Sequence, residues 1–207
     1  MSMLIHPGHP ILQTRSTEVP IKDIQSEKIR SIVNRMLEVA TGGRQDLTKQ
    51  ITVGLAAIQM GIPLRIILVD VGINSKDKKP GDLKVYINPE ITEYSGEMEE
   101  GKEGCLSVDK RLIGIVSRAL NITIKAYDRE GNPVTEKLEG FTARIFQHEY
   151  DHLEGRRFPD RVGEEGDLHW VEEDQFPEYR EKWMAWERCP WGVWESMKNP
   201  PLQDANQ

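Results

Sequence analysis

The sequence predicts an α+β fold, in which mostly antiparallel strands pack around a central helix that carries candidate metal ligands. Three observations support this class: an N-terminal helical pattern, a middle part with short strands and turns, and a later helical pattern that contains His-Glu-x-x-His. Strands that follow one another between helices are typical of α+β domains. We expect one main domain over residues 1–162, with its helix near the N-terminus, and a Trp-rich C-terminal extension over residues 163–207 that packs on it.

Composition and charge exclude several classes of protein. The 207 residues are 38% hydrophobic and 29% charged, which is typical of a globular protein with a sizeable core. The net charge of -7 does not favour direct binding to nucleic acid. No apolar run approaches the ~20 residues that span a bilayer, and the N-terminus resembles neither a secretory signal nor a transit peptide. We therefore expect a cytoplasmic protein without membrane contact, and we expect it to be a monomer.

The first elements follow from prolines and from hydrophobic spacing. Residues 1–22 are predicted to form an extended, proline-punctuated lead-in. Residues 26–40 carry apolar side chains at helical spacing and end before two glycines, so we expect an amphipathic helix. Residues 64–71 form a β-branched run that is typical of a buried strand, and residues 84–87 indicate a second, short strand.

The middle of the chain predicts a hairpin followed by the central helix. Residues 91–104 are acidic and glycine-punctuated, and we assign no strand to them. Residues 120–127 alternate between apolar and polar side chains, which predicts a half-buried strand, and the turn over residues 128–133 leads into another strand. Residues 141–155 show helical spacing without a proline, and Gly155 can provide a left-handed cap at the C-terminal end.

The C-terminal extension differs in composition from the rest of the chain. All five tryptophans lie beyond Pro159, among many carboxylates. Residues 178–188 are compatible with a helix that carries Trp183 and Trp186 on adjacent turns. We expect the aromatic side chains to fold this acidic extension against the main domain. The alternative is an exposed tryptophan patch that binds a partner.

The stretch from His148 to His152 carries the strongest chemical motif. On a helix, His148 and His152 lie four residues apart on one face, where their rings can hold one metal ion. Glu149 would then lie beside the ion, where a carboxylate can accept a proton from a bound water. Taken alone, the same pattern also fits two histidines that are hydrogen-bonded within a core.

A catalytic site of this kind needs a third protein ligand, and three positions can be considered. One arrangement has a histidine six residues after the second, but Phe158 stands there. Another takes a glutamate about twenty residues further on, where Glu172 and Glu173 lie in a generally acidic tail. The third is Cys105, which follows Gly104 and whose thiolate suits a soft or borderline metal. We rank Cys105 first and Glu172 second.

Three segments together resemble the signature motifs of the peptide deformylase family. They are, in this order, Thr52 to Gln59, Glu103 to Ser107, and Gln147 to His152. The second and third match the motifs at every position, whereas Thr52 stands where the first motif has a glycine. The resemblance runs from about residue 3 to about residue 162. It therefore implies a peptide deformylase-like catalytic domain over residues 1–162 and does not extend to the Trp-rich tail.

The resemblance implies a hydrolase that removes the N-formyl group from the initiating methionine of new polypeptides and releases formate. It implies a metal site with three protein ligands: Cys105, His148 and His152. The native ion would be Fe(II), with Zn, Ni or Co as alternatives. Glu149 would be the catalytic acid and base, while Gln59 and the backbone N–H of Leu106 would bind the formyl oxygen. The partners would be formylated nascent polypeptides, met in proximity to the ribosome.

A pocket for the methionine side chain is expected beside the ion. Its wall should include Phe141 and Ile145, which lie on the same face of the metal-binding helix, together with Val53 and Gly54 from the first motif. The apolar members of this set could also be ordinary core residues. Because Thr52 adds a side chain near the path of the peptide, we expect an altered preference for the residues after the methionine.

Two other functions are open at this stage. A metalloprotease would use His148, His152 and Glu172, and loss of metal binding on replacement of Cys105 would exclude it. A non-enzymatic protein would bind a partner through the Trp-rich tail, with no stoichiometric metal. A cysteine nucleophile at Cys105 with His148 as base is less attractive, because it leaves His152 and Glu149 without a role.

Overall fold

The computed structural model describes residues 4–42, 52–73 and 81–200, and within them the chain forms two antiparallel sheets. The larger sheet has the order β1-β2-β3-β6-β7: β1 (Gly54–Ala56), β2 (Ile66–Asp70), β3 (Leu83–Tyr94), β6 (Asn121–Tyr127) and β7 (Pro133–Glu139). The smaller sheet has the order β4-β5-β8: β4 (Met98–Glu103), β5 (Leu112–Ala119) and β8 (Leu168–Trp170). All neighbouring strands are antiparallel, so the α+β class is confirmed.

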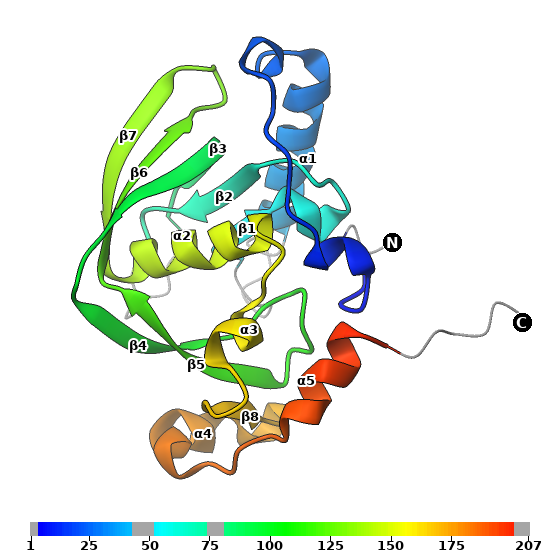
Figure 1. Cartoon of the computed structure of the whole chain (residues 1–207), viewed down its shortest axis with the longest axis vertical. Coiled ribbons are helices and arrows are strands. Elements are labelled where there is room, and N and C mark those ends of the chain that lie inside the picture. The colour runs from blue at the N-terminus through cyan, green and yellow to red at the C-terminus, as the bar shows by residue number, and fades with distance from the viewer. Residues whose placement is uncertain (1–3, 43–51, 74–80, 201–207) are drawn as a thin grey trace, which may run out of the picture.

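The helices surround and fill this framework. The α-helices are α1 (Glu27–Gly42), α2 (Gly140–Leu153), α3 (Phe158–Val162), α4 (Phe176–Lys182) and α5 (Trp191–Lys198). Short 3-10 helices are η1 (Pro10–Gln13), η2 (Ile21–Asp23), η3 (Ala57–Met60), η4 (Glu173–Gln175) and η5 (Trp183–Ala185). Figure 1 shows α2 at the centre, with the larger sheet curving beside it and the C-terminal elements beyond the smaller sheet. Among the described residues, no helix combines the length and apolar character that a membrane span requires.

Strand β2 is buried on both faces because a helix covers each side of the larger sheet. Ile67 and Val69 pack in the cluster that contains apolar side chains of α2. Ile66 and Leu68 point the other way and pack in the cluster that contains α1. Since successive side chains of a strand face opposite sides, two covered faces require a continuous apolar run. This confirms the buried strand predicted over residues 64–71.

Helix α2 confirms the helix predicted over residues 141–155. Its last residue is Leu153, and Gly155 follows with φ of 71°, in the left-handed region. The N–H of Gly155 donates to the carbonyl of His152 at 3.2 Å. A Cβ at Gly155 would also lie 2.7 Å from the carbonyl oxygen of Gln13. Glycine is therefore required there by backbone conformation and by space.

The acidic segment over residues 91–104, to which we assigned no strand, forms the end of β3 and all of β4. The strand predicted over residues 84–87 is only the first part of β3, which continues to Tyr94. The side chains of β4 are mostly exposed, and its order comes from backbone pairing with β5. An apolar pattern could not predict such a strand. The lead-in over residues 1–22 also differs from the extended prediction, because η1 and η2 lie within it.

The C-terminal extension packs on the rest of the chain through a strand and an aromatic side chain. Strand β8 pairs with β5, with Leu168 opposite Gly114. Trp194 of α5 is fully buried, and its Nε1 donates to Asp160 Oδ1 at 3.2 Å. The helix predicted over residues 178–188 is wrong in its second half, because α4 is short and is followed by η5 and an extended turn.

Candidate active site

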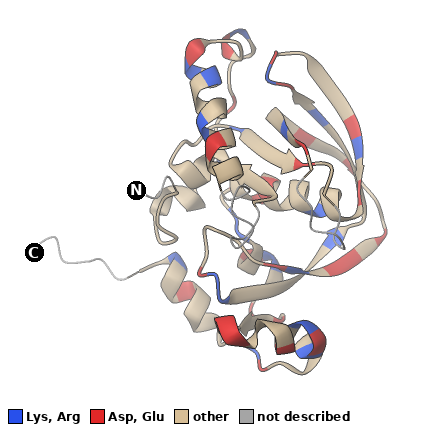
Figure 2. Cartoon of the chain, turned by 180° about the vertical axis from the view of Figure 1, so that it is seen from behind, with Lys and Arg blue, Asp and Glu red and all other residues tan. Residues whose placement is uncertain are grey.

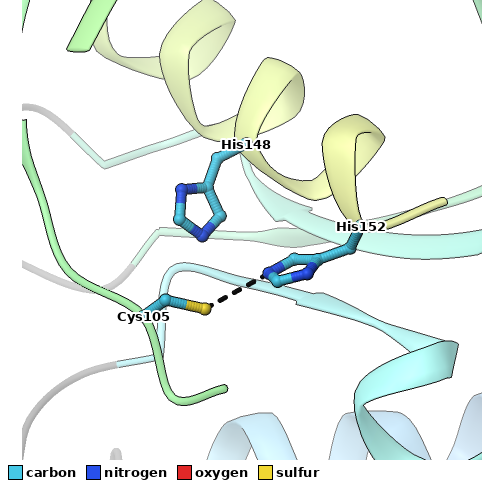
Figure 3. A group of neighbouring side chains, drawn as sticks. All are labelled: Cys105, His148 and His152. Carbon is cyan, nitrogen blue, oxygen red and sulfur yellow. Dashed lines mark hydrogen bonds between the residues drawn. The ribbon is translucent and has the colours of Figure 1, made fainter. Parts of the chain in front are cut away.

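The structure brings the three predicted metal ligands together from two parts of the chain. Cys105 lies on the segment between β4 and β5, whereas His148 and His152 lie one turn apart on α2. Their donor atoms all lie within 4.8 Å of one another, and Cys105 Sγ is 3.2 Å from His152 Nε2. Figure 3 shows the sulfur and both rings directed into one space. Cys105 and Cys189 are both free thiols, so the Cys105 sulfur is available to an ion.

The two imidazoles have the orientation that metal ligands need, but they differ in charge. Burial alone would lower the pKa of His148, but its hydrogen bonds with Cys105 and Glu103 raise it well above its usual value, so this ring must release a proton when an ion binds. His148 Nδ1 donates to Glu103 Oε2 at 2.8 Å, which leaves Nε2 of His148 on the side of the other donors. His152 is 0% exposed. Burial, and then the nearby His148, hold the pKa of His152 well below its usual value, so its ring is neutral. One thiolate and two imidazoles suit Zn or Fe(II), and the site therefore fits a divalent transition ion.

Glu103 is held in turn by two buried arginines. Arg118 donates to both carboxylate oxygens at 2.8 Å, and Arg144 Nη1 donates to Oε1 at 3.0 Å. Burial alone would raise the pKa of Glu103, but the hydrogen bonds from Arg118 and His148 outweigh it and keep that pKa well below its usual value. Sequence reasoning gave Glu103 no role, although its place two positions before Cys105 in a matched motif was a signal. The arginines gave no such signal, because their partners are remote in sequence.

Replacing Glu103 with Gln should weaken metal binding about 10- to 100-fold. The amide keeps the size of the carboxylate but removes the charge that orients His148 and neutralises Arg118 and Arg144. Competition with a chelator measures the dissociation constant, and circular dichroism checks that the variant is folded. Glu99→Gln is the matched control, because the Glu99 carboxylate is 3.8 Å from Arg144 but is 55% exposed. Equal affinity in Glu103→Gln and the wild type would contradict an orienting role.

Glu149 lies in a buried position beside the ligands. Its side chain is buried, and its Oε2 has no hydrogen-bond partner among the described residues. Burial raises the pKa of the Glu149 carboxyl to about 7, because the charged form loses its water. A carboxyl that titrates near neutrality can both accept and donate a proton at physiological pH.

Gln59 is fixed with its amide nitrogen towards the ligands. Its Oε1 accepts a hydrogen bond from the backbone N–H of Ala56 at 2.8 Å. Its Nε2 donates to Ser107 Oγ at 3.0 Å and lies 3.7 Å from Cys105 Sγ. A flip of the amide would lose the bond from the Ala56 N–H, which can only donate, whereas the Ser107 hydroxyl can donate or accept. The Ala56 bond therefore holds the nitrogen on the side where a substrate oxygen can receive a hydrogen bond.

A cavity of about 190 Å³ opens beside the donor atoms. Its lining includes these residues of the predicted site and motifs: Thr52, Val53, Gly54, Gln59, Cys105, Leu106, Phe141, Ile145, His148 and Glu149. Leu106 is 41% exposed, which leaves a large apolar side chain open to a ligand. The lining also contains Lys102, Glu103 and Arg144, which the sequence did not predict there.

The other candidates for the third ligand lie outside this group of donors. The ring of Phe158, which stands where a third histidine would be, stacks 6.4 Å from the ring of His148. The carboxylate of Glu172 is 49% exposed and pairs with Arg111 at 3.6 Å. Its Oε1 also accepts a hydrogen bond from Trp170 Nε1 at 2.8 Å. This placement disfavours the protease arrangement.

Comparisons with known sequences agree over most of the chain. A family model described as Polypeptide deformylase matches residues 1–167. The peptide deformylase of Halalkalibacterium halodurans is 37% identical over 169 residues, which cover 78% of this chain and 90% of that protein. The chloroplastic peptide deformylase 1A of Solanum lycopersicum is 34% identical over 173 residues. The match to this plant relative covers 78% of this chain but only 60% of the relative's length.

Solved structures share the fold. The Met-Ala-Ser-bound class I type b peptide deformylase from Acinetobacter baumannii superposes with a TM-score of 0.68 at 34% identity. That match covers 77% of this chain and 96% of the other. Peptide deformylase from Thermotoga maritima gives a TM-score of 0.64 at 35% identity, with the same covered shares of 77% and 96%. The family match ends at residue 167, so most of the C-terminal extension lies outside it.

Proposed function

Since the chain belongs to the peptide deformylase family of metal-dependent hydrolases, we propose that it removes the N-formyl group from the N-terminal formyl-methionine of newly made polypeptides and releases formate. The observation that carries this proposal is the meeting of Cys105, His148 and His152 beside the cavity that Gln59 and Glu149 line. These groups come from separate segments, and together they provide a metal site, a proton carrier and a hydrogen-bond donor.

Cys105, His148 and His152 would hold one divalent ion. We expect Fe(II) as the native ion, with Zn, Ni or Co able to occupy the same donors, because the ligand set suits several transition metals. When bound, the ion lowers the pKa of a water and polarises the formyl carbonyl.

Glu149 carries the proton through the reaction. Its buried carboxylate takes a proton from the attacking water, and a pKa of about 7 makes this transfer and its reversal easy near neutral pH. When the bond between the formyl carbon and nitrogen breaks, Glu149 gives the proton to the departing amine. Gln59 Nε2 and the backbone N–H of Leu106 stabilise the negative charge on the formyl oxygen, and each such donor contributes about 3 kcal/mol.

The lining of the cavity would select the substrate. Val53, Phe141 and Ile145 provide an apolar wall for the methionine side chain, and Gly54 leaves room for the chain to approach. Thr52 lies in the same lining, so its influence on the residues after the methionine stays a prediction.

The wider setting is also part of the proposal. We expect a catalytic domain over residues 1–162, with the extension over residues 163–207 as an addition to it. The protein would act as a monomer in the cytoplasm, near the ribosome, on nascent chains. The net charge of -7 and the interspersed basic and acidic residues in Figure 2 support the absence of direct nucleic-acid binding.

Formate release from formyl-Met-Ala-Ser tests the function together with the metal site. Protein purified anaerobically with Fe(II) should release formate and contain about one metal ion per chain. Cys105→Ser should lose both properties, whereas Cys189→Ser, which changes the other free thiol, should keep both. Metal retained by Cys105→Ser would favour the protease arrangement with Glu172. A wild-type protein with neither metal nor formate release would point to a non-enzymatic role.

A further inference from the structure

Arg157 is a buried cation to which the mechanism gives no role. It precedes α3 and is 1% exposed. Its Nη1 donates to two carbonyl oxygens, of Pro7 and of Ser107, and its Nη2 has no hydrogen-bond partner among the described residues. The carboxylate of Asp160 accepts from the backbone N–H of Arg157 and not from its guanidinium. Burial of a charge on neutral partners is costly, so Arg157 needs an explanation.

The C-terminal extension holds the guanidinium through Trp194. Cζ of Arg157 lies 4.4 Å from the centroid of the Trp194 ring, and a planar guanidinium is attracted to such a face without losing its charge. The ring is itself fixed, because Trp194 Nε1 donates to Asp160 Oδ1 at 3.2 Å and Lys198 Nζ donates to the same oxygen at 2.7 Å. Figure 1 shows α5, which carries Trp194, beside α3. Trp194 lies beyond the part of the chain that matches the family.

Ser107 connects Arg157 to two groups of the candidate active site. The carbonyl oxygen of Ser107 accepts from Arg157 Nη1 at 3.2 Å. The N–H of Ser107 donates to Cys105 Sγ at 3.3 Å, and its Oγ accepts from Gln59 Nε2 at 3.0 Å. Cys105 and Trp194 also pack against the same apolar cluster. The place of Ser107 therefore affects both a metal ligand and the amide that binds the formyl oxygen.

We propose that Arg157 is a positioning residue, which Trp194 of the extension holds in place so that Arg157 fixes Ser107 and thereby the Cys105 sulfur and the Gln59 amide. This inference rests on the proposed deformylase function. The chain between β4 and β5 forms turns and no regular element, so its backbone depends on contacts of this kind. A displacement of about 1 Å in a catalytic group can cost about 100-fold in rate. The extension thus supports the active site from behind the loop that carries Cys105.

Arg157→Met tests the positioning role by two measurements. With formyl-Met-Ala-Ser, kcat should fall about 10- to 100-fold, while KM stays the same because Arg157 does not line the cavity. In the protein loaded with Co(II), the sulfur-to-cobalt charge-transfer band reports the placement of the Cys105 sulfur, and this band should change. Arg156→Met is the matched control, because the neighbouring Arg156 is exposed, and it should keep the kcat and the band of the wild type. A role in stability alone would lower the thermal midpoint and leave both readouts unchanged below it.

Variants of Trp194 test the part of the extension. Trp194→Leu removes the aromatic face and should lower kcat about fivefold, whereas Trp194→Phe keeps a face for the guanidinium and should restore most of the activity. Adding Trp194→Leu to Arg157→Met should cost little more, because the contact is already lost. Trp183→Leu is the matched control, because the Trp183 ring lies over Lys102 and not over Arg157. Wild-type kcat in Trp194→Leu, or losses that multiply in the double variant, would overturn the role of the extension.

The remaining outcomes distinguish this inference from the function on which it rests. Formate release by the wild type with an equal kcat in Arg157→Met would overturn the inference and leave the function standing. A wild-type cobalt band in Arg157→Met would do the same, even with a lower kcat. Circular dichroism checks folding, and if Arg157→Met does not fold, equal kcat in Trp194→Leu and Trp194→Phe would overturn the inference. No formate from the metal-loaded wild type would overturn the proposed function and the inference with it.

Discussion

Replacing Glu149 with Gln should lower kcat by about 10²- to 10⁴-fold, while the protein keeps one metal ion per chain. Gln matches the size of the side chain but can neither accept nor return the proton. The three ligand side chains are unchanged, so metal binding should persist. Burial disfavours the charged form of this carboxyl, which raises its pKa, and the amide carries no charge. The variant should therefore be at least as stable as the wild type, which is the pattern expected of a catalytic group.

Three measurements on one preparation check this prediction. They are formate release, metal content and the thermal midpoint of unfolding. Glu154→Gln is a suitable control, because Glu154 follows the same helix but pairs with Arg15 and Arg65 and does not line the cavity. Turnover of Glu149→Gln close to that of the wild type would remove Glu149 from the mechanism without affecting the fold.

The parts of the site that could be predicted have local signals. His148 and His152 are four residues apart in a segment with helical spacing, so their shared face follows from helix geometry. The alternation over residues 120–127 likewise predicts β6, whose Ile122 and Ile124 are buried on one face. Such signals need only the neighbouring residues and no knowledge of the tertiary structure.

The third ligand could not be predicted from such local signals. Spacing alone left both Cys105 and Glu172 open, because a ligand from another segment has no fixed distance in sequence from the helix. The family resemblance settled which of them to expect, and the fold places Cys105 beside His152 while Glu172 pairs with Arg111. The choice depended on how β4 and β5 present the loop between them, which is a tertiary property.

The supporting residues were missed for the same reason. In the sequence, Arg118 and Arg144 are charged residues that belong to no motif or periodic pattern. In the fold both are buried around Glu103, because β4, β5 and α2 converge there. In the sequence, Lys102 is a single basic residue in an acidic segment. The groups that its ammonium contacts, on Tyr179 and Arg180, lie about eighty residues later in the chain. Strand β4, which carries both Glu103 and Lys102, has no apolar periodicity, so its pairing could not be predicted. Polar positions that are ordered by long-range contacts are where sequence patterns carry least information.

Replacing Gly54 with Ala should lower kcat/KM about 100-fold, although Gly54 makes no contact through a side chain. A Cβ at this position would lie 2.8 Å from Cγ and 2.9 Å from Cδ of Glu149, which is too close for carbon atoms. The backbone of Gly54 cannot retreat easily, because β1 pairs with β2 with Gly54 opposite Val69. The carboxylate must move instead, and a displacement of about 1 Å is enough to impair proton transfer. Gly96→Ala is the matched control, because a Cβ there meets nothing within 4 Å.

A double-mutant cycle can show that this loss acts through Glu149. In a Glu149→Gln background the proton carrier is already absent, so adding Gly54→Ala should cost little more activity. Metal content should stay stoichiometric in all four proteins, because the overlap does not involve Cys105, His148 or His152. If the two losses instead multiply, Gly54 acts on the substrate path independently, and the close approach to Glu149 has no catalytic consequence. The cycle therefore shows whether Gly54 is needed to leave space for the Glu149 carboxylate or for the substrate peptide. The conformational freedom of glycine alone does not distinguish these two reasons.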